Sequence, residues 1–264
     1  MSGPYTSEFF RSLRPGSYRS AEALLPIVMD MLSPNSVVDV GCGDGSWLAV
    51  LSRHFGIEEV IGIDGPYIDR TDLQIPEERF KAVDLSKPFR LDRDFELAIS
   101  LEVAEHLPAQ AAATFVRSLT ELAPVVLFSA AIPLQGGVQH LNEQWPDYWA
   151  QIFSALGYTA VDCIRPRIWM DDRISLWYRQ NTVLYVRRDD IGLNHRLQFM
   201  ADHRPSRILP LIHPDLYMAR SRPLSLRVGE LARSPMTVAK ILSKRIGSML
   251  TRRLGTKRRE RQSV

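Results

Sequence analysis

The stretch VVDVGCGDGSWL, residues 37–48, has the residue types and the spacing of a ligand-binding turn. A short apolar run leads into three glycines with the spacing G-x-G-x-G, and a helical pattern follows. Glycine allows the backbone to turn tightly and allows a ligand to approach it closely. Asp39 and Asp44 flank the turn. Their negative charges favour a ligand with a positive charge or an amino group over the pyrophosphate that the related spacing G-x-G-x-x-G binds.

Three more acidic residues stand at the ends of strand-like segments. Asp64 ends EVIGID (59–64), Asp84 lies near the end of RFKAVDL (79–85), and Glu102 ends FELAISLE (95–102). In an open parallel sheet, ligands bind beyond the carboxyl ends of the strands. Because carboxylates accept hydrogen bonds from hydroxyl and amino groups, we expect these acids to line one ligand site together with the glycine turn.

Two histidines could serve as a general base near this site. His140 lies in PLQGGVQHLN (133–142), which follows a predicted strand, and His106 lies in SLEVAEHL (100–107). Imidazole has a pKa near neutrality, which suits proton removal from a reacting hydroxyl. We favour His140, with Glu143 as the group that orients it. A loop histidine bonded to a backbone carbonyl and a first-turn helix acid are the alternatives for these two residues.

Aromatic and amide side chains crowd the same region of the sequence. HLNEQWPDYW (140–149) contains Asn142, Gln144 and Trp145, and the connection RPRIWMDDRISLWYRQN (165–181) contains Trp169 and Tyr178. Flat rings with polar edges suit the faces of a sugar ring, and amides suit its hydroxyls. We therefore predict that these five residues bind the acceptor. A core role for the aromatics and an ion-paired surface flap at 165–181 remain open. The adjacent acids of this flap lack a further ligand nearby, so no metal is predicted.

The elements that must position these residues alternate between strands and helices. Strands are expected at 36–41, 59–64, 79–85, 95–102, 124–132, 158–164 and 181–188, and helices at 20–32, 46–55, 109–122 and 143–158. Ser20 is the predicted N-cap of the first helix. Pro146 fits only the first turn of the last helix, and Gly157 is expected to follow its end. This alternation predicts an α/β fold with a doubly wound, seven-stranded, mainly parallel sheet.

The charge of the chain differs between its body and its end. Residues 219–264 carry 13 Lys and Arg and two acids, whereas the other 218 residues have a net charge of −8. We predict an enzyme domain over 1–188 and an extension over 189–264, with a proline-broken linker at 204–223 and a basic amphipathic helix at 236–254. Two distant cysteines and the lack of a secretory pattern indicate the cytoplasm.

The glycine turn and the ordered acids resemble the motifs of class I S-adenosylmethionine-dependent methyltransferases over residues 20–187. The resemblance implies S-adenosylmethionine as cofactor and S-adenosylhomocysteine as product. It places Asp64 on the ribose, Asp84 and Leu85 at the adenine, and Glu102 at the methionine end, in the stretch that resembles motif IV of the family. The implied cofactor residues are Asp39, Gly41, Cys42, Gly43, Asp64, Asp84, Leu85, Leu101 and Glu102.

The acceptor segments, AAIPLQGGVQHLNEQWPDYW and RPRIW…WYRQN, resemble a bacterial methyltransferase subgroup found beside glycosyltransferases in surface-glycan gene sets. That resemblance implies O-methylation of a sugar hydroxyl, on a glycan or on a nucleotide- or lipid-linked sugar. A small-molecule N- or O-methyltransferase and a non-catalytic, cofactor-binding scaffold of a glycosyltransferase complex are the alternatives. The acidic body and the lack of a [DN]PP[YF] motif argue against nucleic acid. The basic extension suits the anionic inner membrane surface or a glycosyltransferase partner.

Overall fold

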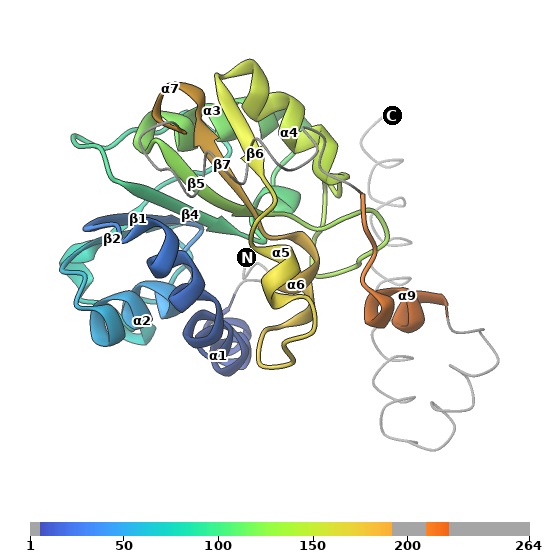
Figure 1. Cartoon of the computed structure of the whole chain (residues 1–264). Helices are drawn as coiled ribbons and strands as arrows, with labels where there is room; N and C mark the ends of the chain where they lie inside the picture. Colours follow the sequence, from blue (N-terminus) through green and yellow to red (C-terminus); the bar gives the residue numbers. More distant parts are fainter. Residues whose placement is uncertain (1–5, 192–209, 222–264) are drawn as a thin grey trace, which may run out of the picture. The chain divides into compact units, whose positions relative to one another are not determined.

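The computed structural model describes residues 6–191 and 210–221, and it divides the chain into two compact units, residues 1–216 and 217–264. The first unit contains a seven-stranded sheet with the order β3-β2-β1-β4-β5-β7-β6 (Figure 1). Only β7 runs antiparallel to its neighbours, β5 and β6. The predicted doubly wound, mainly parallel sheet is therefore confirmed. The strands are β1 (Ser36–Val40), β2 (Glu59–Asp64), β3 (Phe80–Ala82), β4 (Leu97–Leu101), β5 (Val125–Ser129), β6 (Tyr158–Val161) and β7 (Val183–Arg187).

Helices cover both faces of this sheet (Figure 1). One face packs against α1, α2, α5 and α6, and the other packs against α3 and α4. The α-helices are α1 (Ser7–Leu32), α2 (Ser46–Phe55), α3 (Ala112–Leu122), α4 (Pro146–Ala155), α5 (Arg165–Ile168), α6 (Leu176–Asn181), α7 (Arg188–Ile191) and α9 (Pro214–Ser221). Short 3₁₀ helices are η1 (Arg70–Asp72), η2 (Glu77–Arg79), η3 (Ala104–His106) and η4 (Ala109–Ala111).

The central strands are buried on both faces, which explains their continuous apolar sequence. Along β1, Val37 packs into the core under α1 and α2, and its neighbour Val38 packs into the core under α3 and α4. Successive side chains of a strand point to opposite faces. A strand covered by helices on both sides therefore needs apolar residues at consecutive positions rather than alternate ones.

The first helix begins much earlier than predicted. Helix α1 starts at Ser7, with Thr6 as the N-cap that accepts a 3.3 Å hydrogen bond from the Phe9 amide. Pro15 lies inside the helix and does not end it. The predicted N-cap, Ser20, instead lies within the helix, donates a 2.6 Å hydrogen bond to the Gly16 carbonyl and accepts one from the Ser175 amide. The prediction of Ser20 as N-cap was wrong.

The fourth helix follows its prediction closely. Helix α4 has Pro146 in its first turn, where the missing proline N–H costs nothing because that donor has no partner within the helix. Gly157 follows the C-cap with a φ of +86°, a conformation that glycine adopts without strain. Both predictions are confirmed.

The segment predicted as a linker contains ordered structure. Residues 214–221 form α9, and the described residues that precede it belong to the first unit. Gln180 of α6 donates a 2.6 Å hydrogen bond to the Leu211 carbonyl and accepts one from the His213 amide. The boundary at residue 188 remains a prediction, and the predicted helix at 236–254 lies outside the described residues. In the described ranges, no helix combines the length and apolar character needed to cross a bilayer.

Candidate active site

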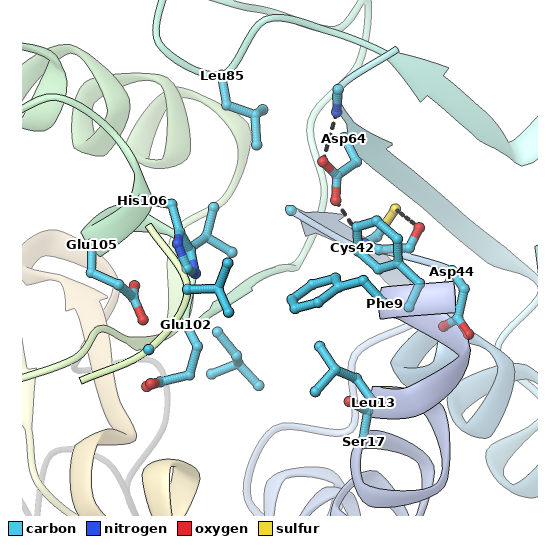
Figure 2. Close-up of a pocket in the computed structure, with 18 of the residues that line it drawn as sticks. Phe9, Leu13, Ser17, Cys42, Asp44, Asp64, Leu85, Glu102, Glu105 and His106 are labelled. Atoms are coloured by element: carbon cyan, nitrogen blue, oxygen red, sulfur yellow. Dashed lines mark hydrogen bonds between the residues drawn. The ribbon is translucent and has the colours of Figure 1, made fainter. Parts of the chain in front are cut away.

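A pocket of about 730 Å³ opens at the carboxyl ends of β1, β2 and β4, a volume typical of sites for small molecules. Its lining comes from the acids and glycines at the strand ends, the loop that follows β5, the first part of α1, and Trp177 and Tyr178 of α6. Figure 2 shows Glu105 and His106 across the pocket from Phe9 and Leu13 of α1. The predicted residues in its lining are Asp39, Gly41, Cys42, Gly43, Asp64, Asp84, Leu85, Leu101, Glu102, His106, His140 and Tyr178.

The glycine turn after β1 is fixed by sterics and by Asp64. Gly41 has a φ of +86°, and a Cβ there would lie 2.3 Å from a methyl group of Val103. The Gly43 amide donates a 2.7 Å hydrogen bond to Oδ2 of Asp64. The Gly65 amide and the Tyr67 hydroxyl each donate a 2.6 Å hydrogen bond to Oδ1 of the same carboxylate. The end of β2 thus holds the turn in place.

The two acids that flank the turn have different environments. Asp39 is buried and its Oδ2 atom has no hydrogen-bond partner among the described residues. Burial, together with the nearby carboxylates of Asp64 and Asp44, raises the pKa of Asp39 well above its usual value. Asp44 instead accepts a 3.1 Å hydrogen bond from the amide of Ser46, the first residue of α2, and forms a 2.6 Å ion pair with Arg14. Of the two, Asp39 is the carboxylate left for a cationic ligand.

The third strand contributes a more exposed carboxylate. The Asp84 side chain is 51% exposed and pairs with Lys87 at 3.0 Å. Hydrogen bonds from the Ser86 hydroxyl and then from Lys87 lower the pKa of Asp84 to about 2. Leu85 follows as a buried apolar residue of the pocket wall. Asp84 is therefore ionised at neutral pH and can accept hydrogen bonds from a ligand.

Glu102 ends β4 in a backbone conformation that is uncommon for its residue type. Its φ is +57°, and two amide side chains hold its carboxylate. Asn181 donates a 3.0 Å hydrogen bond to Oε1, and Gln135 donates a 2.8 Å hydrogen bond to Oε2. Burial raises the pKa of Glu102 despite these donors. The loop after β5 and the end of α6 thus meet at this carboxylate.

The two predicted base candidates lie side by side. The ring centroids of His106 and His140 are 4.9 Å apart, and the two rings lie edge-to-face. Nδ1 of His140 lies 2.8 Å from Oε1 of Glu143. Burial and the neighbouring His140 lower the pKa of His106 to about 4. His106 is therefore a poor proton acceptor at neutral pH, and the choice of His140 as the base stays a prediction.

Glu143 lies behind His140 and is not part of the pocket lining. Its Oε2 atom accepts a 2.8 Å hydrogen bond from the Leu134 amide, and its Oε1 atom accepts one of 2.9 Å from Gly136. Burial opposes ionisation of Glu143, but hydrogen bonds from His140 and from these two amides outweigh it and lower its pKa. An ionised Glu143 next to Nδ1 orients His140.

The predicted acceptor residues fall into two groups. Tyr178 lines the pocket, and its ring packs edge-to-face against Trp47, with 5.1 Å between the ring centroids. The other four residues lie outside the lining. Asn142 is buried and accepts a hydrogen bond from the Gln144 side chain, Trp145 is the N-cap residue of α4, and Trp169 packs on His213 at 4.7 Å. Trp177 of α6, 39% exposed, lines the pocket in their place.

The predictions missed the wall that α1 provides. Phe9, Phe10, Leu13, Arg14 and Ser17 line the pocket. These residues recur at the three- and four-residue spacing of a helix face, and that periodicity continues into residues 20–32. The spacing was available in the sequence, although Pro15 and Gly16, two residue types that disfavour the interior of a helix, interrupt it.

Comparisons with known proteins place the fold among methyltransferases. A family model described as "Methyltransferase domain" matches residues 13–161, and no curated protein matches. A chain from the complex of the Haloferax volcanii Trm112 methyltransferase activator with a methyltransferase is 16% identical, with a TM-score of 0.51, and the match covers 69% of this chain and 94% of that one.

Two further solved structures are similar at lower scores. Magnesium protoporphyrin IX methyltransferase from Synechocystis, solved with S-adenosylhomocysteine, is 18% identical with a TM-score of 0.46, and the match covers 65% of this chain and 84% of that one. Human N-acetylserotonin methyltransferase, solved with S-adenosylmethionine, is 15% identical with a TM-score of 0.46, over 68% of this chain and 55% of that one.

Proposed function

The chain belongs to the methyltransferase domain family, and we propose that it transfers the methyl group of S-adenosylmethionine to a sugar hydroxyl. The sugar is part of a glycan or of a nucleotide- or lipid-linked precursor, and S-adenosylhomocysteine is the second product. The observation that carries this proposal is the continuity of the pocket. One cavity joins the carboxylates at the strand ends to the two histidines of the opposite wall.

In this proposal the cofactor lies along the ends of β1, β2 and β4. The buried Asp39 and the partly buried Glu102 hold the methionine end, where the cofactor carries its ammonium and sulfonium charges. Asp64 accepts hydrogen bonds from the ribose, and Asp84 accepts one from the adenine amino group. A positive charge in the pocket favours ionisation of the buried acids, because an opposite charge nearby stabilises a carboxylate.

The acceptor lies between the cofactor and the loop that contains His140. Because Glu143 occupies Nδ1 of His140, Nε2 is the atom that accepts the proton of the reacting hydroxyl. The hydroxyl oxygen then attacks the methyl carbon in line with the breaking carbon–sulfur bond, whose electron pair stays on sulfur. The protein contributes mainly by holding the two reactants in this geometry. Trp177 and Tyr178 offer ring faces to the sugar.

A second acceptor class is favoured by the apolar part of the lining. Leu13, Leu107 and Val138 face the pocket, and such a wall also suits a hydroxylated small molecule of low polarity. The proposed sugar acceptor rests on the aromatic side chains of α6 and on the resemblance of the acceptor segments to glycan-modifying methyltransferases.

A transfer assay tests the proposal. The full chain is incubated with methyl-labelled S-adenosylmethionine and separate sets of nucleotide sugars, lipid-linked sugars and phenolic alcohols. We expect labelled methyl ether on a sugar, and loss of this product in His140→Gln but not in His54→Gln, whose exposed histidine lies outside the pocket. Transfer only to phenols would support the second class. Cofactor binding without transfer to any hydroxyl would overturn the enzyme mechanism and favour a scaffold.

A further inference from the structure

Three potential metal ligands converge on one wall of the pocket. Glu105, His106 and His140 each offer a ligand atom, and these atoms lie within 4.8 Å of one another. Glu105 and His106 come from η3, directly after β4, and His140 comes from the loop after β5. Figure 2 shows Glu105 and His106 next to each other on the side of the pocket that faces α1.

The Glu105 side chain provides the second observation. It is fully buried, and neither of its carboxylate oxygens has a hydrogen-bond partner among the described residues. Burial of an ionised carboxylate without a partner costs several kcal/mol. The residue nevertheless lines the pocket, so a cation bound in the pocket can reach it and compensate this cost.

Both imidazoles are arranged as metal-bound histidines commonly are. Nδ1 of His140 lies 2.8 Å from the Glu143 carboxylate, and Nδ1 of His106 lies 3.4 Å from the Gln139 carbonyl. A carboxylate or a backbone carbonyl next to one ring nitrogen orients the imidazole and fixes its tautomer, as is common for metal-binding histidines. A Cβ at Gly137 would lie 2.0 Å from Nε2 of His140, so the absence of a side chain at Gly137 is what lets the His140 ring take this position.

We propose that Glu105, His106 and His140 bind a divalent first-row transition-metal ion. Two imidazoles and one carboxylate form a donor set of intermediate softness, which suits Mn²⁺, Fe²⁺, Co²⁺ or Zn²⁺ better than Mg²⁺ or Ca²⁺. Three protein ligands leave coordination positions open for a hydroxyl oxygen. The metal site stands on these three residues alone, and its role in catalysis rests on the proposed function for the position of the acceptor.

The bound ion changes how the acceptor is activated. Coordination lowers the pKa of the acceptor hydroxyl, and its proton leaves to solvent. The resulting oxygen attacks the methyl carbon while the carbon–sulfur electron pair passes to sulfur. Nε2 of His140 is then a ligand and no longer the proton acceptor. Metal dependence of the methyl transfer therefore decides between these two roles of His140.

Titration of the metal-stripped full chain with Co²⁺ tests the site, because the visible bands of Co²⁺ report nitrogen and oxygen ligands. We expect one equivalent of Co²⁺ to bind, to give these visible bands and to raise the melting temperature of the protein. Glu105→Gln should bind Co²⁺ more than about 100-fold more weakly. Gly137→Ala should also weaken binding, because its methyl group displaces His140. Matched controls are His54→Gln and Glu121→Gln, which change exposed residues outside the pocket.

Two outcomes would overturn the metal site. One is no Co²⁺ band or thermal shift in the native chain, and the other is equal Co²⁺ binding by Glu105→Gln. Calorimetry with S-adenosylmethionine on the same metal-stripped protein separates this result from a failure of the proposed function. Cofactor binding and full methyl transfer in chelator would retain the function with His140 as base and would reject the catalytic role of the metal.

Discussion

Nδ1 of His140 lies 2.8 Å from Oε1 of Glu143, and the same carboxylate accepts hydrogen bonds from the amides of Leu134 and Gly136. One side chain therefore binds the beginning of the loop after β5 and orients the histidine near its end. Gln135 of this loop also bonds to Glu102 at the end of β4. The loop is thus fixed to the strand ends on which we place the cofactor.

Replacement of Glu143 by Gln tests this arrangement. Gln keeps only one of the two oxygens that accept hydrogen bonds from the Leu134 and Gly136 amides, and it loses the charge that fixes the tautomer of His140. We expect kcat to fall by about 10- to 100-fold, with unchanged affinity for S-adenosylhomocysteine. Glu121→Gln, at an exposed ion pair with Arg90, serves as control. A normal kcat in Glu143→Gln, measured by transfer of labelled methyl, would contradict the role of Glu143.

The turn after β1 gives a stability prediction with an internal control. Gly41 and Gly157 have the same φ of +86°, but a Cβ at Gly157 meets nothing within 4 Å, whereas one at Gly41 lies 2.3 Å from Val103. Gly157→Ala should cost about 1–2 kcal/mol from backbone strain alone. Gly41→Ala should cost more and should also weaken cofactor binding. Urea unfolding measures both. Equal losses would show that the contact with Val103 has no energetic consequence.

The positions of the strand-end residues could be predicted because the fold repeats a simple pattern. Each parallel strand is a short apolar run that ends at the same edge of the sheet, so Asp39, Asp64, Asp84 and Glu102 could be assigned to one site. The class I fold and the methyltransferase family are confirmed. The sugar acceptor and the individual residue roles stay predictions.

Asp39 should make the stability of the protein without cofactor depend on pH. Its pKa is raised in the folded state, so the unfolded chain loses this proton first as the pH rises above about 4. Stability therefore falls with rising pH over this range. Asp39→Asn should remove that loss and be more stable than the native chain at pH 7, yet bind S-adenosylmethionine more weakly. Parallel pH profiles of unfolding for the two proteins would contradict the prediction.

Asp84 should make stability depend on pH in the opposite direction from Asp39. Its folded pKa of about 2 lies below its usual value, so its stabilising contribution is present above about pH 4 and is lost as the pH falls toward 2. Asp84→Asn should be less stable than the native chain at neutral pH, with a difference that shrinks on acidification. Thermal melts between pH 7 and pH 3, flanking about pH 4, give the measurement. A difference that grows toward low pH would refute it.

The contact between α1 and the glycine turn should matter for cofactor binding. Arg14 makes a 2.6 Å ion pair with Asp44 and a 2.8 Å hydrogen bond to the Asp72 carbonyl. Arg14→Gln should lower the free energy of unfolding by about 1–2 kcal/mol, and it should weaken the affinity for the cofactor. Arg11→Gln removes a more exposed pair with Asp72 and should leave cofactor affinity unchanged, because exposed ion pairs contribute little. Equal cofactor affinity in both variants would argue against a role for α1.

The features that could not be predicted from the sequence depend on contacts between distant segments. His106 and His140 lie far apart along the chain, and only the folding of the loop after β5 brings His140 next to Glu105 and His106. In the sequence, the adjacent acids at 171–172 were the only pair weighed as metal ligands, so this cluster was missed. Trp169 was assigned to the acceptor from its residue type, whereas the structure packs it on His213, a contact that no local pattern indicates.

Calorimetric titration with S-adenosylmethionine and then with S-adenosylhomocysteine, on the native chain and on Asp64→Ala, tests the central claim most directly. We expect micromolar binding of both ligands by the native chain and a loss of about tenfold or more in the variant, because Asp64 holds the turn and is the residue that we propose for the ribose. No binding of either ligand by the folded native chain, or unchanged affinity in Asp64→Ala, would contradict the assignment of this pocket to the cofactor.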